Sequence, residues 1–205
     1  RLPFLSEVFA PDVLYSFHHR ISIAGFILTL AHPLILFIHN PYTLNLLNPF
    51  TTTARAAAGV TAVLVVLPLI VTSVWRLALG LDYENWRLLH DVFAVAVIGF
   101  ALYHILNVDY YTSVPLQRGL IVGLAVIWGA MIIYIRVIKP WALLQRPYEV
   151  VDVIEERGNT WSLVLEPLRH GGLNFRAGQV GWLSLGHSPF RIEEHPFSFA
   201  SSAER

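Results

Sequence analysis

Residues 18–32 read HHRISIAGFILTLAH and residues 90–104 read HDVFAVAVIGFALYH, two apolar stretches that each begin and end on histidine. In both stretches the terminal histidines are 14 positions apart. A helix turns about 100° per residue, so the second ring returns to within about 40° of the first. With a rise of about 1.5 Å per residue, the two rings lie about 21 Å apart along the axis. Two such helices facing each other would present two stacked imidazole pairs, which suits two bis-histidine haems.

The composition predicts an integral membrane protein. Of the 205 residues, 55% are hydrophobic and only 14% are charged, and the apolar runs approach the roughly 20 residues that cross a bilayer core. The chain has no cysteine, which excludes disulfides and thiolate-ligated zinc or iron–sulfur sites within it. A formal net charge of zero argues against nucleic acid as a partner. We therefore expect the lipid bilayer as a partner, and the sequence leaves the oligomeric state open.

The expected fold class is a membrane all-α helical bundle followed by the start of an antiparallel β-barrel. Four transmembrane helices are predicted, at residues 13–39, 54–80, 87–108 and 118–139. The predicted domains are a lead-in over 1–12, a haem-binding transmembrane domain over 13–141 and the first part of a β-barrel domain over 147–205. Because the chain begins on Arg1 and not on methionine, we expect it to be the middle of a longer protein.

The basic residues that flank the spans predict the orientation in the membrane. Most of them gather at one end: Arg1, Arg20, Arg76, Arg87, Arg136, Lys139 and Arg146. Arg55 and Arg118 lie at the other end. The positive-inside rule therefore places the first end in the cytoplasm, together with the chain after Lys139. The first and third helices then run parallel, with His18 level with His90 at the inner side and His32 level with His104 at the outer side.

The chain changes character after Pro147. In residues 161–166, WSLVLE, tryptophan and leucine alternate with other side chains at the period of a β-strand. Gly158-Asn159 lies between two such runs and favours a hairpin turn. The predicted strands are 148–156, 161–166, 180–185 and 197–200. We expect them to begin a cytoplasmic antiparallel β-barrel.

The histidines have alternative interpretations. A single histidine in a membrane helix can simply hydrogen-bond a neighbouring helix, but two pairs of equal spacing favour ligation. His19 competes with His18, yet the 13 residues from His19 to His32 rotate the ring about 140° off the shared face. His39 lies seven residues beyond His32. It is interpreted as an interfacial histidine at a helix end, with a role in meeting an external electron acceptor as the alternative.

Several motifs together resemble one family. Phe17-His18 with His32 and the run WRLLH over residues 86–90 with His104 resemble the ferric reductase-like transmembrane domain of NADPH oxidases and ferric reductases. Gly178-Gln179-Val180 and the run HPFS over residues 195–198 resemble the FAD-binding barrel of the same family. The resemblance covers nearly the whole chain.

The resemblance implies that His18 and His90 ligate an inner b-type haem and that His32 and His104 ligate an outer one. Haem propionates need cationic partners. Arg20, Arg76 and Arg87 are placed for the inner haem, and Arg55 and Arg118 for the outer one. The alternative is that each is simply a positive-inside or interfacial charge.

The resemblance also implies a flavin site in the run HPFS. His195 would approach the FAD pyrophosphate, with Pro196 beside it in the same strand. Phe197 would pack against the isoalloxazine ring, and Ser198 would hydrogen-bond near its reactive nitrogen. The flavin domain is expected in the cytoplasm, on a plasma or inner membrane.

The implied activity is transmembrane electron transfer from cytoplasmic NAD(P)H, through FAD and two haems, to external ferric iron or dioxygen. The family normally has additional helices before this point and a nicotinamide-binding domain after it, and we expect both to lie outside this stretch of sequence. The oxidases carry a further histidine four residues beyond the outer ligand of the first haem helix, and Leu36 stands there in this chain. This departure favours a metal reductase over a superoxide-producing oxidase.

Two other functions fit parts of the sequence. A cytochrome b subunit that exchanges electrons with quinone or a partner protein would need the haems, but it would not need a flavin strand of its own. A proton-coupled transporter could use the intramembrane histidines as a proton relay. A transporter of this kind would lack the visible absorption of haem.

Overall fold

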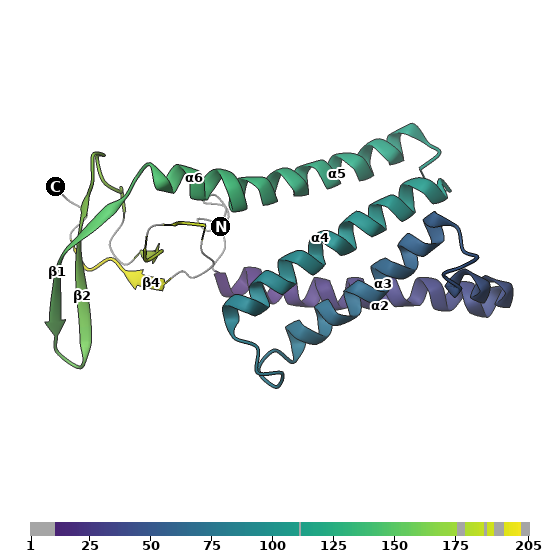
Figure 1. The fold of residues 1–205 in the computed structure, drawn as a ribbon, viewed down its shortest axis with the longest axis horizontal. Helices are drawn as coiled ribbons and strands as arrows, with labels where there is room; N and C mark the ends of the chain where they lie inside the picture. The colour runs from purple at the N-terminus through teal and green to yellow at the C-terminus, as the bar shows by residue number, and fades with distance from the viewer. Residues whose placement is uncertain (1–10, 111, 176–178, 187, 191–194, 202–205) are drawn as a thin grey trace. The chain divides into compact units, whose positions relative to one another are not determined.

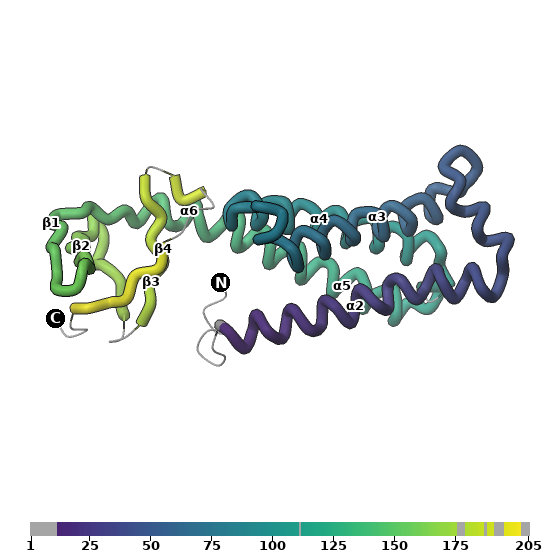
Figure 2. The backbone as a smooth tube through the Cα atoms, turned by 90° about the horizontal axis from the view of Figure 1, so that it is seen from below, coloured from purple at the N-terminus to yellow at the C-terminus, as the bar shows by residue number. Residues whose placement is uncertain are grey.

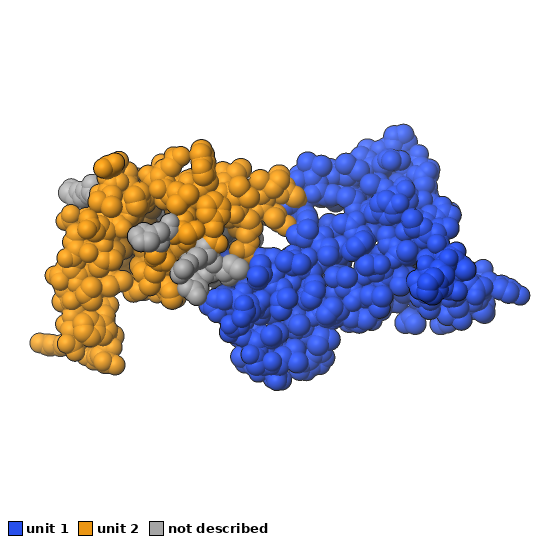
Figure 3. Space-filling model, in the orientation of Figure 1, with its two compact units in different colours: residues 1–128 blue, residues 129–205 orange. Residues whose placement is uncertain are grey.

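A computed structural model describes residues 11–110, 112–175, 179–186, 188–190 and 195–201, and Arg1 and Gly178 lie outside the described residues. The chain forms two compact units, residues 1–128 and residues 129–205 (Figure 3). Each unit is considered by itself. The boundaries proposed from the sequence, 13–141 and 147–205, stay predictions.

Four described helices are long and apolar enough to cross a membrane (Figure 1). They are α2 (Pro11–His39), α3 (Ala54–Val74), α4 (Tyr83–Val108) and α5 (Pro115–Ile133), the last of which continues through a π-helical turn into α6. This confirms the four spans predicted from the sequence. Large apolar side chains on the helices are exposed, such as Ile38 at 82%, which is typical of surfaces that face lipid.

The loops between the first helices are short and locally capped. A 3₁₀ helix, η1 (Pro41–Leu47), follows α2, and the Asn40 side chain accepts a hydrogen bond from the Tyr42 amide at its start. Pro33 lies inside α2, where its ring removes one backbone donor from the helix. At the end of α4, Asp109 adopts a left-handed conformation with φ of 56°, which ends the helix.

The sequence prediction for the second helix was wrong at its end. The helix was expected to reach residue 80, but α3 ends at Val74 and residues 76–80 form a turn. Gly80 has a φ of 65°, a conformation that glycine adopts at little cost. The Arg76 guanidinium donates a hydrogen bond to the Leu81 carbonyl at 3.1 Å. These features let the chain reverse before α4 begins at Tyr83.

Helices α3 and α4 form the best-packed pair in the first unit. Ala58 and Ala62 on α3 are buried, and small side chains of this kind let two helices approach closely. Helix α2 runs beside this pair, with its backbone set apart along its length (Figure 2). Among the described residues, α2 has only slight contact with α3.

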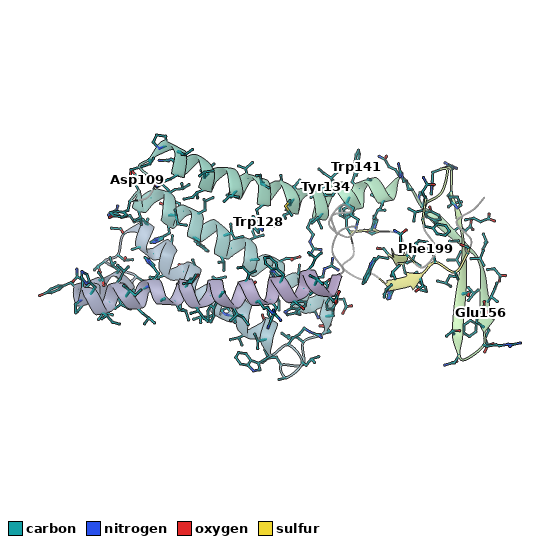
Figure 4. All side chains as sticks on the ribbon, turned by 180° about the vertical axis from the view of Figure 1, so that it is seen from behind. Asp109, Trp128, Tyr134, Trp141, Glu156 and Phe199 are labelled. Carbon is teal, nitrogen blue, oxygen red and sulfur yellow. The ribbon has the colours of Figure 1, made fainter. Side chains whose placement is uncertain are left out.

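The segment that continues α5 departs from regular α-helical hydrogen bonding. Residues Tyr134–Ile138 form a π-helical turn, which leads into α6 (Lys139–Leu144). Tyr134, the first residue of the turn, and Trp141, within α6, are labelled in Figure 4. Pro140 follows the turn closely and has no N–H for a helical hydrogen bond, which explains why the regular α-helix is interrupted here.

The strands of the second unit form two two-stranded antiparallel sheets. Strands β1 (Tyr148–Glu156) and β2 (Thr160–Pro167) pair with each other, as do β3 (Val180–Leu183) and β4 (His195–Ser198). Gly158 and Asn159 have φ of 81° and 60°, as a tight hairpin turn requires, so the predicted hairpin is confirmed. The last strand begins at His195, two residues before its predicted start. The β-barrel itself stays a prediction.

Candidate functional site

The four predicted histidines lie in two pairs between α2 and α4. The ring centres of His18 and His90 are 6.2 Å apart, with an angle of 74° between the ring planes. The ring centres of His32 and His104 are 6.4 Å apart, with an angle of 67°. Because the early residues pair with each other and the late residues do the same, α2 and α4 run parallel.

These separations fit a metal held between each pair. Two metal–imidazole bonds of about 2.0–2.1 Å, plus about 1.1 Å from each nitrogen to its ring centre, put the ring centres about 6.2–6.4 Å apart. The observed values of 6.2 and 6.4 Å lie within this range. An edge-to-face contact between rings can have the same separation. The ring separation alone therefore does not distinguish metal ligands from an edge-to-face pair. The hydrogen bonds of the rings supply the further evidence.

Both histidines on α4 have one ring nitrogen hydrogen-bonded to α3. Nδ1 of His90 lies 3.1 Å from Oγ of Ser73, and Nδ1 of His104 lies 2.7 Å from the backbone oxygen of Arg55. Among the described residues, no hydrogen bond reaches Nε2 of either ring. A histidine that binds a metal through Nε2 usually has its Nδ1 engaged in this way, so the α4 rings fit the axial ligands of a haem.

Helix α3 also approaches the outer ring closely. A Cβ atom on Gly59 would lie 2.7 Å from Nδ1 and 2.9 Å from Cε1 of His104. Any side chain at this position would displace the ring or the helix. The sequence interpretation missed Gly59 and Ser73. One signal was available, because these two residues are also 14 positions apart and face the two α4 histidines in the opposite order.

The other two histidines of α2 have no comparable partner. All four histidines of α2 are exposed, but no ring of the described chain lies against His19 or His39 as His90 and His104 lie against His18 and His32. His39 is the last residue of α2. The structure therefore brings together the pairs that the equal spacing predicted, and ligation by these pairs stays a prediction.

The inner pair has aromatic and cationic neighbours. The Trp86 ring centre lies 5.4 Å from that of His90, and the Arg76 guanidinium carbon lies 5.9 Å from the Trp86 ring centre. Nε1 of Trp86 is buried and has no hydrogen-bond partner in the described chain. A buried N–H without an acceptor is costly, so this atom fits a site whose acceptor comes from a bound group.

Two arginines near the outer pair have protein partners. Arg55 donates from Nη1 to the Asn107 carbonyl at 3.4 Å. Arg118 lies 4.0 Å from Oδ1 of Asp109, with both side chains more than half exposed. Ion pairs this exposed are weak, so the guanidinium of Arg118 could exchange its partner at little cost. A propionate role for these arginines stays a prediction.

Among the described residues, no group of three or more histidine, cysteine, aspartate or glutamate side chains could hold a metal ion. The histidine pairs offer two protein ligands each. Two axial ligands are what a metal needs when a macrocycle supplies the others, and haem is such a group.

The run HPFS forms β4, and all four of its side chains are exposed. His195 pairs with Leu183 and Phe197 pairs with Gly181 on β3. Phe199 follows the strand and is labelled in Figure 4. Its ring stacks on Phe175 with centres 4.5 Å apart and planes 13° apart. The strand therefore presents the predicted flavin residues on an accessible surface.

Comparison with known families decides the nature of the first unit. Residues 1–101 match the family described as the ferric reductase like transmembrane component. Residues 1–101 are similar to a ferric reductase-like transmembrane domain. This confirms the resemblance of the transmembrane part, and the match includes His18, His32 and His90. The resemblance of the later residues to an FAD-binding barrel stays a prediction. No curated protein and no solved structure matches the chain.

The ferric reductase-like domain and the four candidate spans make this chain an integral membrane protein. The family implies an oxidoreductase that transfers electrons across the membrane.

Proposed function

We propose that this protein transfers electrons across a membrane, from cytoplasmic NAD(P)H to an external acceptor, with FAD and two b-type haems as the electron carriers. When bound, the flavin would convert hydride into single electrons and the haems would carry these electrons at two depths of the bilayer. The proposed acceptor is ferric iron, with dioxygen as the alternative.

One observation carries the proposal. Two pairs of imidazole rings stand between parallel membrane helices at 6.2 and 6.4 Å, close to the separation that two axial metal ligands require. His18 and His90 would hold the inner haem, and His32 and His104 the outer one. With both axial positions taken by histidine, neither iron has an open position. An acceptor would then have to approach the edge of the outer site.

The flavin part of the proposal is supported by the second unit. His195, Pro196, Phe197 and Ser198 lie in one exposed strand, where neighbouring residues point to opposite faces. Phe197 and His195 therefore share one face of β4. Together they could offer an aromatic surface and an imidazole to one flavin. We propose that the two sheets begin the FAD-binding β-barrel, and that this domain lies in the cytoplasm.

The uneven distribution of basic residues between the two ends of the spans supports the proposed direction of electron transfer. Arg20, Arg76 and Arg87 flank the spans of the first unit at one end, and basic residues are enriched on the cytoplasmic side. His18 and His90 are nearer to this end than His32 and His104. Electrons from a cytoplasmic flavin would therefore meet the inner pair first.

A visible absorption spectrum of the purified protein, before and after dithionite, tests the proposal. We expect a b-type Soret band that shifts on reduction and two haems per chain. An absence of any haem band would contradict the proposal and favour the proton-coupled transporter. Haem without any retained or titratable FAD would favour the cytochrome b subunit that exchanges electrons with quinone or a partner protein.

A further inference from the structure

Helix α3 contains no histidine, yet it contacts both histidines of α4. Gly59 and Ser73 on α3 are 14 positions apart, as are His90 and His104 on α4. The helices run in opposite directions, so Ser73 meets His90 and Gly59 meets His104. The same helix therefore contacts the candidate α4 ligands of both sites.

The hydrogen bond at the outer site determines which nitrogen of His104 carries the proton. The partner of Nδ1 is the backbone oxygen of Arg55, at 2.7 Å. A carbonyl oxygen can only accept a hydrogen bond, so Nδ1 must be the donor. In the neutral ring, Nε2 then has the free lone pair that a metal needs.

At the inner site the same conclusion follows in two steps. The Ser73 hydroxyl has one hydrogen, and Oγ lies 2.6 Å from the Leu69 carbonyl, which can only accept it. Oγ therefore accepts a hydrogen bond from Nδ1 of His90, at 3.1 Å. Nε2 of His90 again has the free lone pair. An edge-to-face contact between His18 and His90 would not require Nδ1 of His90 to donate to Ser73 and Nε2 to keep a free lone pair.

We propose that α3 is the positioning element of both haem sites. Ser73 fixes the tautomer and ring orientation of His90, and the Arg55 carbonyl with the space left by Gly59 fixes those of His104. This inference rests on the proposed function, because it assumes that the two histidines bind haem iron. It adds Ser73 and Gly59 as positioning residues that touch the ligands and not the iron.

The proposal predicts an effect on the redox potential of one haem only. An acceptor for Nδ1–H makes the imidazole a stronger donor to iron and so favours the ferric state. The loss of such a hydrogen bond changes metal binding by about 10- to 100-fold. If Ser73→Ala weakens ferric binding about tenfold relative to ferrous binding, the midpoint potential rises by about 59 mV.

The experiment is a spectroscopic redox titration of the purified, haem-loaded protein. We expect Ser73→Ala to raise the potential of one of two one-electron components, while both haems stay bound. Ser73→Thr keeps the hydroxyl and should restore the wild-type potential. Thr72→Val is the matched control, because Thr72 bonds to the Pro68 and Leu69 carbonyls and not to a histidine. Unchanged potentials in Ser73→Ala would overturn the role of Ser73.

Gly59→Ala tests the outer site. Its Cβ would lie 2.7 Å from Nδ1 of His104, so the ring has to move and its bond to the Arg55 carbonyl breaks. We expect this variant either to lose the outer haem or to keep it with a shifted midpoint potential. The redox component of the inner haem should be unchanged. Gly123→Ala on α5 is the control, since a Cβ there has nothing within 4 Å. Two unaltered haem components in Gly59→Ala would overturn the role of Gly59.

The failures of the two proposals are distinguishable. Wild-type protein without haem would contradict the proposed function itself. Wild-type protein with two haems, one of which is lost in His90→Leu, would support that function. Unchanged titrations of the Ser73 and Gly59 variants would then overturn the inference about α3 alone.

Discussion

The rings of His32 and His104 reach toward each other from two different helices, with their centres 6.4 Å apart. Fourteen residues earlier on each helix, the rings of His18 and His90 repeat this relationship at 6.2 Å. The spacing of α2 and α4 is therefore nearly constant over about 21 Å of helix. A constant spacing at both levels is what two similar ligands, one above the other, would require.

The outer pair can be tested by removing either ring. We expect His32→Leu and His104→Leu each to lose about half of the haem, because each iron would lose one of its two axial ligands. The inner haem should stay bound. The measurement is haem per chain by the pyridine haemochrome method. His39→Leu is the control, as His39 lies at the end of α2, and it should retain both haems. Full haem content in both ligand variants would contradict the assignment.

The inner pair offers a sharper comparison between adjacent residues. His18→Leu should lose one haem, whereas His19→Leu should retain two, because only His18 has its ring centre 6.2 Å from that of His90. Both substitutions replace a histidine with leucine at adjacent positions of α2. Haem content and the number of redox components measure the outcome. If His19→Leu loses the haem and His18→Leu retains it, the pairing is wrong.

Much of the fold could be predicted because the decisive patterns are local. Apolar length predicted four spans, and the turn residues Gly158 and Asn159 predicted a hairpin whose φ angles the structure confirms. The equal spacing of His18 with His32 and of His90 with His104 predicted which rings meet, since parallel helices with one periodicity must match at both levels.

The remaining features depend on contacts between helices. The end of α3 at Val74 depends on how Arg76 and Gly80 build the following turn, although an apolar pattern continues beyond it. The roles of Ser73 and Gly59 become apparent only from their contacts with the His90 and His104 rings of another helix. Small residues in a membrane helix are common, so their type alone did not distinguish them.

The flavin strand predicts a loss of FAD without a loss of haem. His195→Ala and Ser198→Ala should each weaken FAD binding by about tenfold or more, as expected for losing a hydrogen bond to a charged or polar partner. Fluorescence titration with FAD measures the affinity, and haem content serves as an internal reference. Glu155→Ala on β1, also an exposed position, is the matched control. Wild-type affinity in both variants would exclude β4 from the flavin site.

The hairpin turn predicts a local loss of stability. Gly158 has a φ of 81°, and an L-residue in this region costs about 1–2 kcal/mol. Gly158→Ala should therefore increase the opening of the β1–β2 hairpin by about 5- to 30-fold. Hydrogen exchange of the β1 and β2 amides, followed by mass spectrometry, measures this. Arg157→Ala in the same turn should have little effect, and equal exchange in the two variants would show that the turn is not strained.

The acceptor can be tested at Leu36, four residues beyond His32 on α2. Dithionite-reduced protein freed of excess reductant should be reoxidised faster by chelated Fe(III) than by dioxygen, because Leu36 offers no polar group near the outer site. Leu36→His should raise the rate with dioxygen relative to that with Fe(III). Ile35→His is the control, since one residue rotates the ring about 100° away from that face. Stopped-flow absorbance at the Soret band gives both rates. If wild-type protein reacts faster with dioxygen and superoxide accounts for all the electrons, the preference for metal is wrong.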